Sequence, residues 1–361
     1  MDGFERMATD LRWGAALVGA GVAGVTSALV VALIRRRATE MGLVDVPNAR
    51  SSHQLPTPRG GGLGILAGVF LAVATVGSIS PGSMTGKAVV LLACSLVVGV
   101  VGLIDDRGGL SPRVRLCLQS GAAAVLVVTV GPVSSVPLPA PFGIGLGSAW
   151  VAVPFTVLWV TAMTNFFNFM DGVDGLAGGQ AVASCGGAIL AGASVESVVV
   201  AGALGGASTG FLVHNWPPAR IFMGDVGSGA IGFLLAGLPL LAPPERRSTA
   251  VLSTAIGLTF FILDPVLTLL RRALRREALM TAHRGHLYQR LIPAGTSGTG
   301  VTKLLLAGAI LLSALGAWAY HFPEMIWGAI GASVVLFSIE GACASRVQSR
   351  LTAKTALIGR R

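Results

Sequence analysis

Charged residues are scarce in this sequence. Asp, Glu, Lys and Arg make up only 12% of its 361 residues, whereas a soluble globular domain contains about 25%. Hydrophobic residues account for 53%, so the composition excludes an ordinary soluble fold and predicts an integral membrane protein. There are 16 acidic residues against 26 basic ones. The basic residues stand at the ends of apolar runs rather than in one patch, so membrane topology explains them, and nucleic acid is not an expected partner.

Cysteine is also rare, and its four positions form no motif. Each lies inside an apolar run, and the spacings match neither a metal site nor a disulfide framework. We therefore expect these four residues to pack in the protein interior: Cys94, Cys117, Cys185 and Cys343.

No stretch of the chain has the composition of a separate soluble domain. Apolar segments recur along its whole length, and they equal or approach the roughly 20 residues that a membrane-spanning helix needs. They lie at about residues 13–34, 63–80, 86–104, 114–131, 149–166, 180–195, 197–213, 228–242, 248–270, 301–320 and 323–343. This pattern predicts an all-α, polytopic membrane protein with about 11 transmembrane helices. We expect residues 1–361 to form one domain, with a core at about 13–343 and a basic cytoplasmic tail at 344–361.

The distribution of basic residues predicts the orientation of the chain. With the N-terminus outside, all but five of the 26 Lys and Arg residues lie on the inner side, as the positive-inside rule requires. The five exceptions are Arg6, Arg12, Lys87, Arg246 and Arg247. The same threading places every polar cluster described below at the inner face, so we expect the active face to be cytoplasmic.

A short run at residues 165–179 is the richest in chemistry. Asn165, Asn168, Asp171 and Asp174 recur at every third position at the end of an apolar segment. They therefore wind around one stretch of chain near the membrane surface. Carboxylates beside hydrocarbon are costly and mark functional sites, and the two Asp-Gly steps predict tight turns that a ligand can approach closely.

Three further carboxylates follow or precede apolar runs. Asp105 and Asp106 are adjacent at the end of the run 86–104, where they repel each other and favour a cation. A solvated helix end is the alternative reading, and Arg107 supports it. Asp225 stands among glycines before an apolar helix, and a single carboxylate suits Mg²⁺, which takes one or two carboxylates plus substrate phosphates.

The glycines around Asp225 point to phosphate. Gly224, Gly227 and Gly229 would free backbone N–H groups at a helix N-terminus, where anions bind readily. The plainer alternative is a glycine-rich turn with an aspartate as helix cap.

Two loops add basic and imidazole groups. Arg59 lies in a proline-rich loop whose N–H groups are able to bind an anion, although positive-inside charge alone also explains it. The segment 281–290 contains His283, Arg284 and His286. No third soft ligand accompanies the two histidines, so phosphate binding by the arginine and hydrogen bonding by the histidines suit an anionic substrate better.

Four of these motifs occur in the order of one membrane family. They are the Pro-Thr-Pro-Arg-Gly-Gly-Gly loop, the Asp-Asp pair, the Asn-x-x-Asn-x-x-Asp-Gly-x-Asp-Gly-Leu-Ala run and Phe-Met-Gly-Asp-x-Gly-Ser. The chain resembles the polyprenyl-phosphate N-acetylhexosamine-1-phosphate transferases of glycosyltransferase family 4, from about residue 13 to residue 340. This family includes the peptidoglycan translocase, phospho-MurNAc-pentapeptide transferase, and the enzymes that initiate O-antigen and teichoic acid synthesis.

The resemblance implies a reaction in the bacterial plasma membrane. Undecaprenyl phosphate attacks the β-phosphorus of a UDP-N-acetylhexosamine, UMP leaves, and a lipid-diphosphate sugar remains in the bilayer. Mg²⁺ is the implied cofactor, with Mn²⁺ as an alternative, and a homodimer is left open. The implied catalytic residues are Asp105, Asp106, Asp171, Asp174 and Asp225, with Asp171 and Asp225 as metal ligands. The implied substrate-binding residues are Arg59, Asn165, Asn168, Gly224, Ser228, His283, Arg284 and His286.

One departure from the family bears on the substrate. The peptidoglycan translocase has consecutive histidines where this chain has His-Arg-Gly-His at 283–286, and the Tyr-Gln-Arg that follows at 288–290 is similar to the O-antigen initiating branch. The resemblance therefore implies UDP-GlcNAc, or a 6-deoxy relative such as UDP-FucNAc or UDP-QuiNAc, rather than a muramyl-pentapeptide donor.

Phosphate chemistry limits the roles of the carboxylates. The second pKa of a phosphate monoester is about 6, so the lipid phosphate that acts as the nucleophile is largely dianionic at neutral pH. We therefore favour a single displacement over a covalent aspartyl-phosphate, and base catalysis by Asp105 or Asp106 is left open.

Two other functions compete with the transferase. A transporter also has buried carboxylates, but it places them near the bilayer midplane, whereas these lie at helix ends. A CDP-alcohol phosphotransferase needs Asp-Gly-x-x-Ala-Arg followed by two spaced aspartates, and the run at 174–178 lacks the arginine and the continuation.

Overall fold

The structure is a computed structural model that describes residues 2–47, 55–136, 138, 142–278, 285–292 and 298–358. Its α-helices, in chain order, are α1 (Asp2–Arg37), α2 (Gly62–Ile79), α3 (Gly86–Gly108), α4 (Pro112–Val130), α5 (Ala149–Met170), α6 (Leu176–Ala191), α7 (Val195–Asn215), α8 (Asp225–Gly237), α9 (Pro244–Gly257), α10 (Thr259–Leu274), α11 (Leu287–Arg290), α12 (Thr299–His321) and α13 (Ile326–Ile358). Two 3-10 helices, η1 (Leu238–Leu241) and η2 (Pro323–Met325), complete the helical set. In these ranges the only strands are β1 (Val44–Asp45), β2 (Thr57–Pro58), β3 (Ser135–Val136) and β4 (Ile144–Gly145), paired antiparallel as β1–β2 and β3–β4.

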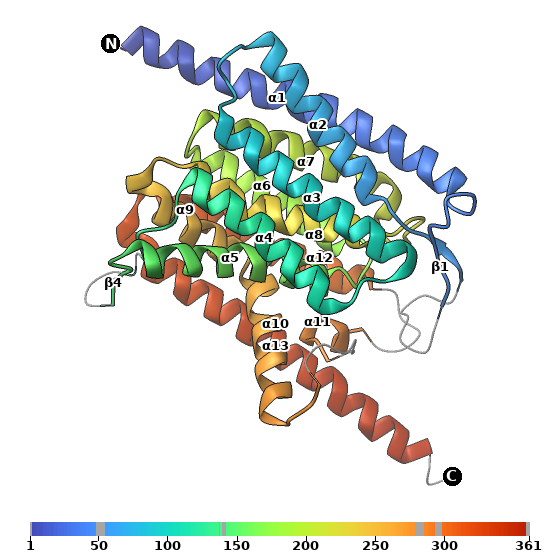
Figure 1. The fold of residues 1–361 in the computed structure, drawn as a ribbon. Coiled ribbons are helices and arrows are strands. Elements are labelled where there is room, and N and C mark those ends of the chain that lie inside the picture. Colours follow the sequence, from blue (N-terminus) through green and yellow to red (C-terminus); the bar gives the residue numbers. More distant parts are fainter. Residues whose placement is uncertain are drawn as a thin grey trace.

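The helices lie side by side in one bundle (Figure 1). Eight segments of the described chain are long and apolar enough to cross a membrane, or nine if the bent pair α9 and α10 counts as one span. The helix α6 and the segment Asp225–Leu241 are apolar but shorter. The predicted all-α, polytopic membrane fold is thus confirmed. The number of eleven spans and the orientation stay predictions.

The predicted span at 248–270 is wrong in shape. The chain bends by 77° between α9 and α10, and α10 runs away from the bundle beside the last helix (Figure 1). The bend follows Gly257, whose carbonyl accepts a hydrogen bond from the Gln180 side chain at 3.0 Å. A side chain that captures a helical carbonyl is a recognised cause of a helix break, and the apolar pattern carries no sign of it.

Arg246 and Arg247 lie at the other end of the bundle and are two of the five basic residues predicted on the outer side. Their contacts explain why they lie there. Arg247 is buried and donates to the carbonyls of Val130, Pro132 and Leu240 at 2.9–3.1 Å. Arg246 lies over the ring of Tyr320, 4.3 Å from its centroid. Arg247 satisfies helix-end and loop carbonyls, and Arg246 packs on an aromatic ring. Both side chains therefore stabilise the structure at that end.

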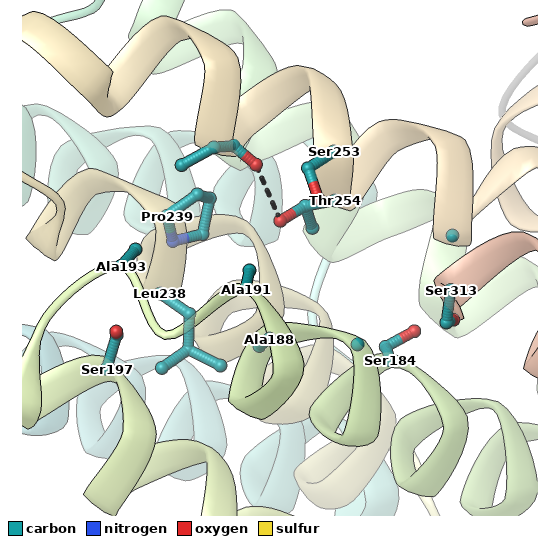
Figure 2. Close-up of a pocket in the computed structure, with 13 residues that line it drawn as sticks. Ser184, Ala188, Ala191, Ala193, Ser197, Leu238, Pro239, Ser253, Thr254 and Ser313 are labelled. Carbon is teal, nitrogen blue, oxygen red and sulfur yellow. Dashed lines mark hydrogen bonds between the residues drawn. The ribbon is translucent and has the colours of Figure 1, made fainter. Parts of the chain in front are cut away.

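A small cavity between α6, α9 and α12 lies on the same side of the molecule as these arginines. Its volume is about 30 Å³, and Figure 2 shows hydroxyl side chains such as Ser184, Ser253 and Ser313 around it. Such a volume suits one water molecule and excludes a sugar nucleotide. The cavity therefore has no place in the candidate active site.

Candidate active site

Glycines bring the ends of three helices into contact at the predicted inner face. A Cβ atom on Gly102 of α3 would lie 2.3 Å from the carbonyl oxygen of Asp225, and one on Gly62 of α2 would lie 2.2 Å from the Cα of Gly227. Both helices therefore approach the first turn of α8 at backbone distance, which larger side chains would prevent. This packing brings Asp105 and Asp106, at the end of α3, beside Asp225.

The loop before α2 is joined to the segment before α8 by backbone hydrogen bonds. Phe222 donates to Pro58 at 2.8 Å, Gly61 donates to Phe222 at 2.9 Å, and Gly62 donates to Met223 at 2.9 Å. These bonds fix Arg59, the next residue after Pro58, at the start of α8.

Asp106 caps α8 from outside the helix. Its buried carboxylate accepts hydrogen bonds from the amides of Asp225 at 3.2 Å and Val226 at 3.1 Å. Gly224 has a φ of 76°, and a Cβ there would lie 2.7 Å from Asp106 Oδ2. The predicted phosphate position at this helix N-terminus is thus taken by a carboxylate of the protein. Any contact of Gly224 or Ser228 with substrate stays a prediction.

Two arginines neutralise part of the negative charge. Arg59 Nη1 lies 3.9 Å from Asp106 Oδ1, and the same guanidinium donates to the Asp106 carbonyl. Arg115 donates to Asp105 and, at 2.7 Å, to Asp225 Oδ2. Arg115 therefore joins the end of α3 to the start of α8. The sequence does not predict this role, because no motif contains Arg115 and only its position in the first turn of α4 marks it.

The asparagines and aspartates at the end of α5 have different surroundings. Asn165 donates to the Gln119 side chain of α4 at 2.9 Å, which ties α5 to α4. One oxygen of Asp174 accepts from the amide of Ala219 at 2.9 Å, which ties the turn to the loop before α8. Asp171 follows the last residue of α5, and Asn168 lies one turn earlier and is half-buried.

The carboxylates converge on Asp171. Burial, together with the charges of Asp225, Asp106 and Asp174, raises the pKa of Asp171 to about 7. Carboxylates that raise one another's pKa form a site that favours a cation. In the part of the chain that the structure describes, no three His, Cys, Asp or Glu side chains surround one ion position. Mg²⁺ needs only one or two carboxylates beside substrate phosphates, so Asp171 and Asp225 fit it.

The predicted histidine segment is only partly described. His283 and Arg284 lie outside the described residues, so their predicted roles are untested. His286 is buried, with its Nδ1 3.2 Å from Asp264 Oδ1, and a contact between this ring and the sugar stays a prediction. The sequence motifs predict no catalytic role for Asp264 or for Tyr288, whose hydroxyl donates to the carbonyl of Phe169 at 3.1 Å.

Comparison with known proteins relates the chain to membrane transferases. The family model for glycosyl transferase family 4 matches residues 88–242, which include Asp105, Asp171 and Asp225. A probable undecaprenyl-phosphate N-acetylglucosaminyl 1-phosphate transferase of Bacillus subtilis is 34% identical over 320 residues, covering 82% of this chain and 85% of that protein. The decaprenyl-phosphate N-acetylglucosaminephosphotransferase of Mycobacterium leprae is 33% identical over 375 residues, covering 92% and 91%. The phospho-N-acetylmuramoyl-pentapeptide-transferase of a Nostoc species is 37% identical over 201 residues, covering 51% and 53%.

Proposed function

The chain belongs to glycosyl transferase family 4, and on this basis we propose that it transfers N-acetylhexosamine-1-phosphate from a UDP-sugar to a polyprenyl phosphate. One observation carries the proposal: carboxylates from three helix ends lie close enough at one end of a membrane bundle to act on one another electrostatically, and Arg115 is bonded to two of them. Such a site binds a diphosphate through a cation and leaves the lipid tail in the bilayer. We place this site on the cytoplasmic side of a bacterial plasma membrane.

The reaction is a single displacement at phosphorus. An oxygen of the lipid phosphate attacks the β-phosphorus of the UDP-sugar, and a new P–O bond forms. The bond from that phosphorus to the bridging oxygen breaks, and its electron pair leaves with UMP. Phosphoryl transfer of this kind depends mainly on positioning and on neutralising charge.

The hydrogen bonds of the Asp-Asp pair support a positioning role. Both oxygens of Asp106 accept backbone N–H groups of α8, and Asp105 accepts from the amide of Leu110 at 2.6 Å and from Arg115. These bonds occupy the oxygens of both carboxylates, and a largely dianionic phosphate does not need a strong base. Asp105 and Asp106 therefore hold the start of α8 in place.

Asp171 and Asp225 are the residues that would hold Mg²⁺, or Mn²⁺ in its place. When bound, the ion neutralises charge on the diphosphate. Arg59 and Arg115 add fixed positive charge beside it. Asn168 is half-buried one turn from Asp171, and we assign it hydrogen bonds to the nucleotide.

The names of the relatives support GlcNAc as the sugar. The Bacillus and Mycobacterium proteins are both named as N-acetylglucosamine phosphate transferases, and they align with most of the chain, whereas the muramoyl-pentapeptide enzyme aligns with half of it. We therefore place UDP-GlcNAc first and UDP-FucNAc or UDP-QuiNAc next. Undecaprenyl phosphate is the acceptor to test first, with decaprenyl phosphate beside it.

A transfer assay tests the proposal. Purified protein is incubated with the polyprenyl phosphate and a panel of radiolabelled UDP-N-acetylhexosamines, with Mg²⁺ or with EDTA. We expect label in the lipid phase only with Mg²⁺, and a loss of about 100-fold or more in Asp225→Asn, since removal of a metal ligand removes charge neutralisation in the transition state. Glu324→Gln, an exposed acid in η2, is the matched control and should retain full activity. Folded wild-type protein that transfers no sugar from any donor would overturn the proposal.

A further inference from the structure

Asp264 is a fully buried carboxylate in α10 with an unusually complete set of donors. Its side chain has 0% exposure. It accepts from Thr268 Oγ1 at 3.0 Å within its own helix, from the amides of Leu287 at 3.0 Å and Tyr288 at 3.1 Å, and it lies 3.2 Å from His286 Nδ1. Three of the four partners thus belong to one distant segment.

These three partners are His286, the residue that precedes α11, and the first two residues of α11. A helix begins with amides that have no partner inside it, and a helix of only four residues, Leu287–Arg290, does not persist by itself. Asp264 supplies the missing acceptor from another helix. Leu287 and Leu291 complete the attachment by packing against Ala344 of α13.

The neighbouring buried acid has no comparable role. Glu340 of α13 is only 3% exposed, and among the described residues neither of its side-chain oxygens has a hydrogen-bond partner. It lies close enough to Asp264 to interact with it electrostatically, yet the amides of Leu287 and Tyr288 donate to Asp264. The attachment of α11 therefore depends on one of the two acids alone.

Tyr288 connects α11 to the turn after α5 that contains Asp171. The side chain is fully buried, and its hydroxyl donates to the carbonyl of Phe169 at 3.1 Å. A Cβ atom on Gly172 would lie only 2.2 Å from that hydroxyl, so the tyrosine fits directly against the turn. Phe169 and Gly172 flank Asp171 in the chain.

We propose that Asp264 is a positioning residue of the transferase: it caps α11 and so holds Tyr288 against the turn that carries Asp171. The contact itself is independent of the reaction, whereas its catalytic consequence rests on the proposed function. Asp264 touches neither substrate nor metal in this proposal. Its effect reaches the reaction through Tyr288 and the backbone around Asp171.

The test combines hydrogen exchange with kinetics on the purified full-length protein. Mass spectrometry follows deuterium uptake in the peptide 285–292, and the transfer assay gives kcat, KM for the donor and the half-saturating Mg²⁺ concentration. Asp264→Asn places an amide donor against backbone N–H groups, and Tyr288→Phe removes only the hydroxyl. Glu340→Gln is the matched acid-to-amide control, and Thr268→Val removes the one donor that does not come from α11.

We expect faster exchange of the peptide 285–292 in Asp264→Asn and unchanged exchange in the two controls. In both Asp264→Asn and Tyr288→Phe, kcat should fall by about 10- to 100-fold, as for small misplacements of catalytic groups, and more Mg²⁺ should be needed, with little change in KM. Unchanged exchange in Asp264→Asn would overturn the capping contact. Faster exchange with wild-type kcat and Mg²⁺ dependence in both variants would overturn the positioning role. If the wild-type protein transfers nothing, the proposed function and this role in it both fail, while the exchange arm still decides whether Asp264 holds α11.

Discussion

At the scale of single residues, the ionisation of Asp171 should make the affinity for Mg²⁺ depend on pH. With a pKa raised to about 7, this carboxyl is mostly protonated below that pH in the metal-free protein and ionised above it. Burial, with Asp106 and Asp105 nearby, raises the pKa of Asp225, the second proposed ligand, to about 7 as well. Because a metal ligand must lose its proton, the apparent affinity for Mg²⁺ should fall by up to about 100-fold per unit as the pH drops below 7, and it should level off above 7.

Calorimetric titration of Mg²⁺ between about pH 6 and pH 8 measures this dependence and the proton release that accompanies it. Asp171→Asn keeps Asp225 as its one titrating ligand, so its residual affinity should fall by only about tenfold per unit below pH 7. A wild-type affinity that is constant over this range would contradict the assignment of Asp171 as a ligand.

The sequence predicts some residues of the site and not others, for a physical reason. Carboxylates at the ends of apolar runs are visible because their cost in a membrane is set by the local sequence, and Asp106, Asp171 and Asp225 do converge electrostatically. Arg115 and Tyr288 are ordinary residues of their types, and their importance comes from what lies opposite them. Asp225 lies 110 residues from Arg115, and Phe169 lies 119 residues from Tyr288, so no local sequence pattern predicts either contact.

At the scale of helices, the contact of α3 with α8 gives a second prediction. Gly102→Ala would put a methyl group 2.3 Å from the carbonyl of Asp225, so α8 must shift. We expect a loss of about 1–3 kcal/mol in the free energy of unfolding, the usual cost of overpacking, and reduced transfer because Asp225 moves. Thermal unfolding in detergent measures the first effect and the lipid-transfer assay measures the second.

Gly86→Ala is the control for this prediction. It lies at the start of the same helix, and a Cβ there would meet no atom within 4 Å. Its unfolding temperature should equal or exceed that of the wild type, because alanine favours the helix. Equal stability of the two variants would show that α3 and α8 do not pack as closely as described.

The helices themselves were largely predictable, and their ends and bends were not. Each predicted apolar run contains a helix, since hydrophobic length is a local property. The predicted span 180–195 begins four residues late, because α6 already starts at Leu176, directly after the polar turn. The 77° bend follows the carbonyl that accepts from Gln180 of another helix. The sequence around the bend therefore does not predict it.

At the scale of the whole molecule, the orientation in the membrane is open to a direct test. The basic residues predict that Arg107 lies inside and that Ser134, in the exposed loop between α4 and α5, lies outside. In a chain whose four cysteines are replaced, Ser134→Cys should react with a membrane-impermeant maleimide in intact cells. Arg107→Cys should react only after the cells are permeabilised. The opposite pattern would place the carboxylate site outside the cell and contradict the proposed location.

The backbone hydrogen bonds between the loop before α2 and the segment before α8 determine which residues around them can be substituted during evolution. Amides and carbonyls are the same in every residue, so side chains such as that of Thr57 can change without loss of this connection. The two glycines cannot change as freely, because a Cβ on Gly61 would lie 2.4 Å from the Phe211 ring and one on Gly62 would meet Gly227. Sequences that diverge from this one should therefore vary around a fixed glycine pair, keeping the frame of the site while its surroundings diversify.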